Sequence, residues 1–421
     1  MKHPALSEIR TQWQSLLLLA LIAWFLLASA YHSALAPSPG VTGIDFQIYY
    51  EASNRLARGE PLYINHPEGS TYVYSPALAL LLRPLARLDY PYALRVWFFI
   101  SALCLGGGVA LYALSARFTW RDLNLAGIIL IIGCRFWPTT MNFSLGQVNF
   151  LILLLLCGVF LADSLERPKT AALLIASAAL LKTWMLGLLV YLILRRKWRE
   201  AALGACLYAL LLAACFTATG WRELPRFFQI TGGYAHQNTG QFAGMQSISG
   251  FAYLHFQKNP LVDPIAANPL LFYGFIGGGF VLILAGCALI WKRTPPRSLY
   301  EARLQLGFVM LSLLLVLPMC QSEYSLFCLP LLWTLIAPPP ERPRSPLVIA
   351  GSFLVYLLFT RGWPGTRSIP EIYRHGAASL VVSANFCAAF ALWLIALLAL
   401  HTLRRAAVQM APAASSPVSV T

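Results

Sequence analysis

The chain has 421 residues, of which 58% are hydrophobic and 11% are charged, and its mean hydropathy is +0.65. This composition excludes an ordinary water-soluble globular protein and indicates a polytopic membrane protein. The formal net charge of +15 is divided among many short loops, which argues against a nucleic-acid-binding surface.

Apolar stretches near the length of a membrane-crossing helix, about 20 residues, recur along the whole sequence. The expected spans lie near residues 14–34, 92–114, 123–141, 149–164, 200–218, 269–291, 304–319, 324–337, 347–361 and 380–402. The region 170–195 has Lys182 in its middle and basic residues at both ends, so we expect two short helices that turn at Lys182. The predicted fold is all-α, a transmembrane bundle of roughly twelve hydrophobic segments.

The first span is followed by Ser33-Ala34-Leu35-Ala36, which resembles the cleavage site of a signal peptide. We favour an uncleaved helix, because the loop that follows needs an anchor. Residues 1–405 are expected to form a single membrane domain, and residues 406–421 a disordered cytoplasmic tail.

Basic residues fall in loops that should all lie on one side of the membrane. They are Arg117, Arg121, Arg167, Lys169, Arg195 to Arg199, Lys292, Arg293, Arg297, Arg303, Arg342 and Arg344, together with Lys2, Arg10, Arg404 and Arg405. The excess of Lys and Arg identifies this side as cytoplasmic, with both termini on it. Two long loops, 35–91 and 219–268, then face the outside.

The sequence shows none of the common motifs for binding a metal or a nucleotide cofactor. The nine cysteines lie in or at the ends of hydrophobic spans, with no Cys-x-x-Cys, so we interpret them as packing residues. The sequence has no Walker loop, no Gly-rich dinucleotide turn and no Asp-x-Asp pair. We therefore expect no metal and no cofactor, and a substrate that comes from the membrane or the outer compartment.

The first long loop begins with an acid and an amphipathic stretch. Phe46 to Leu56 is predicted to form an interfacial helix with Asp45 at its N-terminus, ended by Gly59 and Pro61, and Pro76 should start the next helix. Two interpretations of Asp45 stay open. It can be a helix N-cap, or it can be a carboxylate at the membrane surface, beside Tyr49, that accepts a proton from a hydroxyl.

Four blocks in order along the chain resemble glycosyltransferase family 87, membrane enzymes of the GT-C fold class. The blocks are Asp45-Phe46-x-x-Tyr49-x-x-Ala52 with Gly59-x-x-x-Tyr63 and Tyr74-x-Pro76; Gly146-Gln147-Val148-Asn149 with Leu181-Lys182; Met245-Gln246-Ser247; and Pro318 followed by Glu323-Tyr324. The chain has Ser75-Pro76 where relatives often have two prolines, and Glu323-Tyr324 where many have histidine or Tyr-Asp. A histidine contact to the donor is therefore not carried over.

The resemblance implies sugar transfer from a polyprenyl-phosphate donor to an acceptor hydroxyl at the periplasmic face of the bacterial inner membrane, with inversion. Relatives transfer mannose or arabinofuranose, and the sequence does not decide between them. The absence of a large soluble domain favours a small or lipid-linked acceptor over a folded protein.

The same resemblance implies roles for individual residues. Asp45 is the expected general base, because it is the acid on the matching motif; Glu51 is interpreted as a solvated charge. Lys182 and Arg135, two cations embedded in apolar sequence, are candidates to bind the leaving phosphate, although Arg135 is better explained by snorkelling to the interface. Candidate sugar contacts are Gln147, Asn149, Tyr49, Tyr74, His236 and Glu323. Gln147 and Asn149 could instead cap the following helix, and a lone loop histidine is more often structural.

Two other functional classes remain open from the sequence. A transporter or lipid flippase would also be polytopic, and a segment broken at Lys182 is a feature that transporters use. The lack of a repeat relating the two halves argues against a transporter. A non-catalytic scaffold of the cell envelope is the third class.

Overall fold

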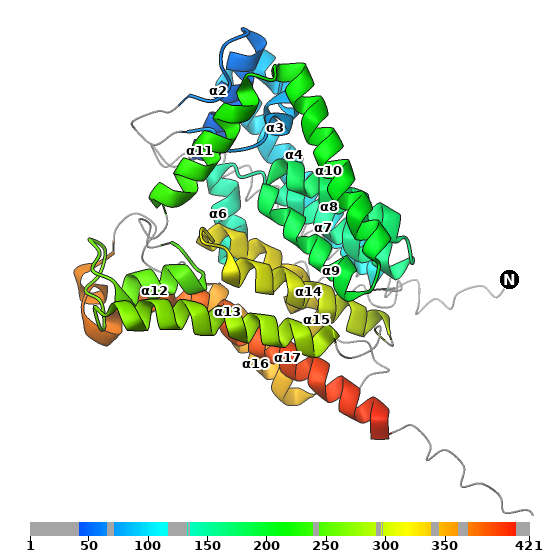
Figure 1. Ribbon diagram of the computed structural model, residues 1–421, viewed down its shortest axis with the longest axis vertical. Helices are drawn as coiled ribbons and strands as arrows, with labels where there is room; N and C mark the ends of the chain where they lie inside the picture. The colour runs from blue at the N-terminus through cyan, green and yellow to red at the C-terminus, as the bar shows by residue number, and fades with distance from the viewer. Residues whose placement is uncertain are drawn as a thin grey trace, which may run out of the picture.

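The structure is a computed structural model that describes residues 42–64, 71–116, 133, 135–238, 244–291, 296, 298–337, 345–360 and 369–409. The described part is helical throughout, apart from its loops and one antiparallel backbone pairing between Met245 and Gln321. The α-helices are α2 (Ile44–Ala57), α3 (Pro76–Leu81), α4 (Tyr90–Ser115), α6 (Trp137–Leu145), α7 (Asn149–Ser164), α8 (Pro168–Leu181), α9 (Leu189–Leu194), α10 (Trp198–Thr219), α11 (Glu223–Asn238), α12 (Ile248–Phe256), α13 (Pro269–Trp291), α14 (Leu299–Val316), α15 (Leu329–Ile336), α16 (Pro346–Phe359) and α17 (Ala384–Gln409) (Figure 1). The 3₁₀ helices are η1 (Leu85–Arg87), η3 (Thr183–Leu188), η4 (Ser322–Cys328), η5 (Glu371–Tyr373) and η6 (Gly376–Ser383).

Within the described residues, five helical segments are long and apolar enough to cross a membrane: Tyr90–Ser115, Trp198–Thr219, Pro269–Ile290, Leu299–Val316 and Gly376–Leu403. Shorter apolar helices cover most of the remaining expected spans, so the predicted all-α polytopic fold is confirmed and the chain is an integral membrane protein. The expected first span 14–34, most of 123–141 and the tail beyond residue 409 lie outside the described residues.

The predicted break at Lys182 is confirmed. Helix α8 ends at Leu181, Lys182 has extended backbone angles (φ −139°, ψ 107°), and η3 begins at Thr183. An extended residue cannot continue the α-helical hydrogen-bond ladder, so the helix is interrupted at Lys182. Lys182 is thus the C-cap of α8, and its side chain is buried.

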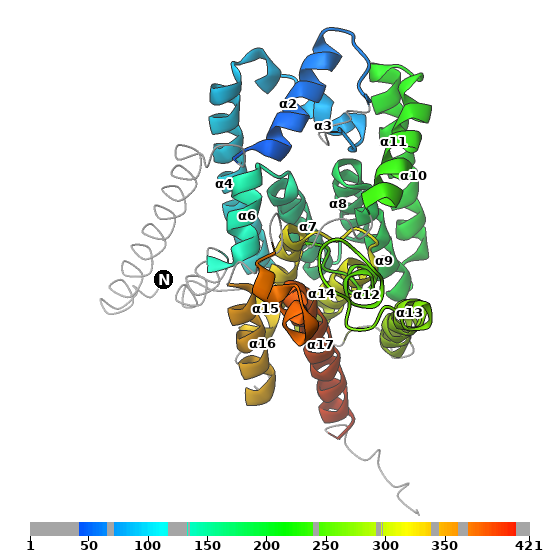
Figure 2. The ribbon, with the colours of Figure 1, turned by 90° about the vertical axis from the view of Figure 1, so that its left-hand side faces the viewer.

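The helices form two groups that meet at α14. Helices α2, α3 and α11 lie together at the top of the molecule, and α4, α7, α8 and α10 run down from them side by side (Figures 1 and 2). We call these helices the N-terminal group, and helices α12 to α17 form the C-terminal group. Helix α14 contacts α7, η3 and α9 on one side and α15 and α17 on the other.

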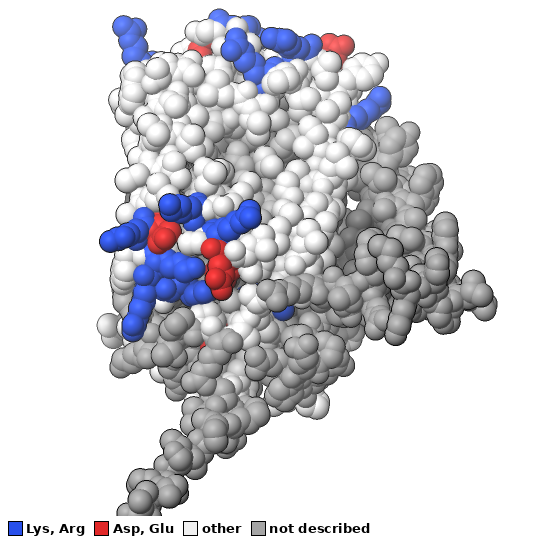
Figure 3. Space-filling model, turned by 90° about the vertical axis from the view of Figure 1, so that its right-hand side faces the viewer, with Lys and Arg blue, Asp and Glu red and all other residues white. Residues whose placement is uncertain are grey.

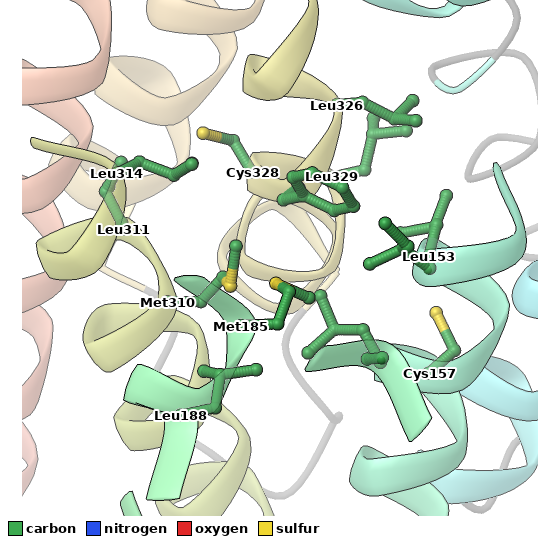
Figure 4. Packing of buried hydrophobic residues seen from close by; sticks show 14 of the residues in the cluster. Leu153, Cys157, Met185, Leu188, Met310, Leu311, Leu314, Leu326, Cys328 and Leu329 are labelled. Carbon is green, nitrogen blue, oxygen red and sulfur yellow. The ribbon is translucent and has the colours of Figure 1, made fainter. Parts of the chain in front are cut away.

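The interior between the two groups is packed with aliphatic and sulfur-containing side chains. Figure 4 shows Leu153 and Cys157 of α7 and Met185 and Leu188 of η3 facing residues of α14, η4 and α15, among them Met310, Leu311, Leu314, Leu326, Cys328 and Leu329. All of these side chains are buried. The burial of Cys157 and Cys328 supports the interpretation of the cysteines as packing residues. The close packing of this core holds η4 against the N-terminal group.

Charged side chains collect at the two ends of the N-terminal group. Figure 3 shows Lys and Arg, with some Asp and Glu among them, on the side at the right of Figure 1, and a second group at the top, with few charges on the described surface between them. Arg167 and Arg196 in the α7–α8 and α9–α10 turns are exposed, and so are Lys169 and Arg199 in the first turns of α8 and α10. A wide surface with few charges is the surface that a bilayer requires.

Candidate functional site

The interfacial helix predicted at 46–56 is α2, and its start differs from the expectation. Gly43 is the N-cap, with left-handed backbone angles (φ 78°, ψ 14°), and Asp45 lies in the first turn. The Asp45 carboxylate accepts a hydrogen bond from the Gln147 side chain, Nε2 to Oδ2, at 2.8 Å. The N-cap interpretation of Asp45 is therefore wrong, although a carboxylate in the first turn still interacts favourably with the helix dipole.

Two glycines allow α2 to reach the end of α6. Gly146 ends α6 with φ 69°, and a Cβ atom there would lie 2.8 Å from the Cβ of Phe46. A Cβ on Gly43 would lie 2.8 Å from Leu94 and 2.9 Å from the hydroxyl of Tyr90. The Gly43 N–H donates to the Ser144 carbonyl at 2.7 Å. Only residues without a side chain permit this approach, which sets Gln147 beside Asp45.

Gln147 is the hub of a buried hydrogen-bond network. Its side-chain oxygen accepts from the Tyr49 hydroxyl at 3.0 Å and from Lys182 Nζ at 3.5 Å, while its Nε2 donates to Asp45. The residue is 3% exposed. One amide therefore connects the predicted base with the predicted phosphate-binding cation.

Lys182 is buried within aromatic surroundings. Its Nζ lies 3.8 Å from the ring centre of Tyr324 and 5.8 Å from that of Tyr74, close enough for cation–π attraction. The charges of Glu323 and Asp45 both act on it. A buried ammonium held in this way offers a strong donor to an anion that enters the site.

Glu323 and Tyr324 come from η4, which is far from the other site residues in sequence. Glu323 is 5% exposed, and its backbone carbonyl accepts from Asn142 Nδ2 at 2.8 Å. Tyr324 stacks on Trp184 with ring centres 5.7 Å apart. Tyr324 was missed as a site residue from the sequence; its position directly after Glu323 was the available signal.

Tyr49 and Tyr74 connect the first loop to the site. Their hydroxyl oxygens are 2.9 Å apart, and the Tyr63 hydroxyl donates to the Tyr74 carbonyl at 2.8 Å. Burial raises the pKa of Tyr49 well above its usual value, and the Asp45 carboxylate adds to this effect. The Tyr49 phenol therefore stays protonated and acts as a hydrogen-bond donor.

Glu223 attaches the first loop to α11, a role that sequence analysis missed. One of its carboxylate oxygens accepts from the backbone N–H of Leu62 at 3.1 Å and of Tyr63 at 3.2 Å, and the other pairs with Arg226 at 2.6 Å. Burial raises the pKa of Tyr63, which packs beside this attachment. Leu62 and Tyr63, which precede Tyr74 in the first loop, are thus fixed to α11.

Asn149 is placed in a structural network behind the site. It is fully buried, and its Nδ2 donates to Asn142 Oδ1 at 2.7 Å. The N-cap of α7 is Val148 without a side-chain cap, so neither Gln147 nor Asn149 caps that helix. The Met245–Gln246–Ser247 block is structural too, since Gln246 bonds the backbone of Val382 and Phe386.

Arg135 is a further predicted site residue that the structure does not bring to Asp45. Arg135 is exposed at the opposite end of α6 from Gln147, next to Phe136, which packs on Tyr356 and Phe359 of α16. Nine residues of helix separate the two ends by about 13 Å. The side chain of His236 lies outside the described residues. No group of three or more His, Cys, Asp or Glu that could hold a metal occurs in the described ranges.

A model of glycosyltransferase family 87 matches residues 72–318, more than half of the chain. The chain belongs to glycosyltransferase family 87. This confirms the family that the sequence blocks indicated, and it makes the protein a membrane glycosyltransferase. Gln147 and Lys182 of this family 87 protein lie inside the matched stretch, whereas Asp45 and Glu323 join them through the fold.

The structure of the family 87 protein is also similar to a solved one, described as the crystal structure of ArnT from Cupriavidus metallidurans bound to undecaprenyl phosphate. The TM-score is 0.46 with 16% sequence identity, over 92% of this chain and 78% of ArnT. Comparison with curated proteins finds no match.

Proposed function

We propose that the protein transfers a sugar from a polyprenyl-phosphate donor to an acceptor hydroxyl, with inversion at the anomeric carbon and with Asp45 as general base. The observation that supports this most is the joining of Asp45 to Lys182 through one side chain, Gln147. A transferase of this kind needs a base for the acceptor and a cation for the leaving phosphate within the length of one sugar, and these residues meet that need.

In the proposed step the acceptor oxygen attacks the anomeric carbon from the face opposite the phosphate. Asp45 takes the hydroxyl proton as the new C–O bond forms. The bond between the anomeric carbon and the phosphate oxygen breaks, and its electron pair leaves with the polyprenyl phosphate. Asp45 then returns the proton to water, so the products are the glycosylated acceptor and polyprenyl phosphate.

Lys182 is proposed to stabilise the charge that develops on the departing phosphate. A buried ammonium is worth more to an anion than an exposed one, because little water competes with it. Arg135 is a weaker candidate for this role, since α6 separates it from the other groups. Tyr74 and Glu323 lie around Lys182 and are the proposed contacts to the donor sugar.

The setting of the reaction follows from the charge distribution and the family. We propose that Asp45 and α2 lie at the periplasmic face of a bacterial inner membrane, in a GT-C type bundle with both termini in the cytoplasm. The exposed basic residues in the α7–α8 and α9–α10 turns and at the starts of α8 and α10 support this orientation. The donor sugar is of the mannose or arabinofuranose class, and the acceptor is small or lipid-linked.

The test is transfer by the purified protein from a panel of polyprenyl-phosphate sugars, followed by analysis of lipid extracts. Asp45→Asn should lower the transfer rate by about 10² to 10⁴, the usual contribution of a general base. Glu51→Gln is the matched control, because Glu51 is an acid of the same helix that accepts from Gln47 on the α2 surface. Full activity of Asp45→Asn would exclude Asp45 as the base, and substrate uptake without transfer would indicate a carrier.

A further inference from the structure

We infer that Gln147 is a positioning residue, which orients the Asp45 carboxylate and holds it apart from Lys182, and does not bind the sugar. This inference rests on the proposed function of Asp45 and Lys182. It reassigns Gln147, for which sugar contact was the expectation from the sequence.

The orientation of the Gln147 amide is determined by its partners. An ammonium can only donate hydrogen bonds and an ionised carboxylate can only accept them. The side-chain oxygen must therefore face Lys182 and the NH₂ group must face Asp45, as observed, at 3.5 Å and 2.8 Å. The Tyr49 hydroxyl, which donates to the same oxygen at 3.0 Å, reinforces this choice. A flipped amide would lose the hydrogen bonds to both Lys182 and Asp45, whichever way the Tyr49 hydroxyl turned.

The backbone of Gln147 is equally constrained. Its N–H donates to the Asn142 carbonyl at 3.0 Å, directly after the left-handed Gly146. The carbonyl of Gly146 accepts from the Trp97 indole at 2.8 Å. A side chain that is 3% exposed and anchored at both backbone and amide has little freedom to follow a substrate.

The neutral amide also prevents a direct ion pair. If the Asp45 and Lys182 side chains met, each charge would satisfy the other, and neither would be available to the acceptor or to the phosphate. With Gln147 between them, Lys182 keeps its aromatic surroundings and Asp45 keeps a hydrogen bond to its charged form. The spacer thus supports both proposed roles at once.

The first test measures Asp45 without any catalytic assay. A hydrophobic carbodiimide reacts with protonated carboxyl groups, so the pH dependence of Asp45 labelling, followed by mass spectrometry of the detergent-purified full chain, reports its protonation. Gln147→Met removes the donor at nearly constant volume and should move the labelling midpoint upward by about one pH unit. Gln47→Met is the matched control, since Gln47 donates to a different carboxylate of α2, Glu51, at 2.8 Å. An unchanged midpoint in Gln147→Met would overturn the inference.

A second variant keeps the test decisive if Gln147→Met does not fold. Gln147→Glu preserves the size and the acceptor oxygen that faces Lys182, but it replaces the donor to Asp45 with a negative charge. The midpoint of Asp45 should then rise by at least as much, because a like charge disfavours ionisation. A midpoint equal to that of the parent protein contradicts a positioning role.

The third measurement separates positioning from sugar binding in the transfer reaction. We expect Gln147→Met to lower kcat by about 10 to 100-fold with the donor KM within about twofold, because a misplaced base affects the chemical step. A raised donor KM with unchanged kcat would assign Gln147 to sugar binding and overturn the inference. Absence of transfer by the parent protein would refute the proposed function, and the labelling result would still decide the role of Gln147.

Discussion

A carboxylate, a cation and a tyrosine meet near each end of helix α7. The two ends of this sixteen-residue helix are about 24 Å apart. At its start, Asp45, Lys182 and Tyr49 meet around Gln147. At its far end the group is Asp163, Arg195 and Tyr191, in which Arg195 Nη1 lies 3.2 and 3.1 Å from the two Asp163 oxygens and 2.6 Å from the Tyr191 hydroxyl. We call these the spaced group and the paired group.

The two groups differ in whether the acid and the cation bind each other directly. In the paired group the Tyr191 hydroxyl also donates to Asp163 at 2.8 Å, so the acid, the cation and the tyrosine are all bonded directly to one another. In the spaced group an amide separates acid and cation. Similar residue types therefore stabilise the fold at one end of α7 and form a site suited to a substrate at the other. The reason is that charges bound to each other in a direct ion pair are not available for catalysis.

The largest expected difference between the groups comes from removing the cation. Lys182→Met should lower kcat/KM for transfer by about 10² to 10³, the cost of removing one charge-stabilising donor. Arg195→Met should leave transfer per folded molecule unchanged and lower the melting temperature. Steady-state transfer and thermal unfolding of both variants check this. Equal loss of transfer in the two would mean that the groups do not differ in function.

The next effect concerns the junction that holds the spaced group. Gly146→Ala forces a side chain into left-handed backbone, at about 1 to 2 kcal/mol, and also against Phe46. Gly59→Ala is a matched control, because Gly59 has φ 70° and nothing within 4 Å of the Cβ position. We expect about tenfold slower transfer for Gly146→Ala only, with the larger fall in melting temperature. Identical behaviour of the two variants would show that the approach of α2 to α6 is not needed.

A smaller effect, on stability alone, is expected from the paired group. Asp163→Asn leaves the largely buried Arg195 without a charged partner and should destabilise the fold by about 1 to 3 kcal/mol. The control is Glu166→Gln, an exposed acid in the turn after α7. Chemical denaturation in detergent gives the free energy of unfolding. Loss of transfer without loss of stability would contradict the structural assignment.

The smallest effect is expected from an exposed acid–base group, His375 with Asp263 and Glu371. The imidazole contacts Asp263 at 2.6 Å and Glu371 at 2.8 Å, and hydrogen bonds to both carboxylates raise the pKa of His375. A raised pKa means that the stabilisation is complete below the ordinary histidine pKa of about 6.5 and is lost as pH rises through the raised value. Hydrogen exchange of residues 369–376, corrected for intrinsic rates, should be faster at high pH than at low pH. His375→Gln should remove this pH dependence, and its persistence would assign the effect elsewhere.

The sequence by itself determined the elements. Apolar length predicted an all-helical membrane chain, and local signals placed the boundaries of α2, the start of α3 at Pro76 and the turn at Lys182 within a few residues. These features depend on neighbours in the chain, whose preferences the sequence shows directly. The order of the motifs likewise gave the family.

Only the tertiary structure decided which residues share the site. Asp45 and Gln147 are 102 positions apart, and no local pattern states that one amide faces the acid while Asn149, two residues on, faces Asn142. Arg135 and Lys182 looked alike in sequence, yet the fold buries one and exposes the other. In a membrane protein both lipid and protein accept apolar side chains, so hydrophobicity does not reveal which face is buried. Of the residues in the most apolar 18-residue stretch, 83% are buried in α14 and 11% in α13, although both helices could span the membrane. Helix packing, which depends on shape and contacts between distant segments, made that choice.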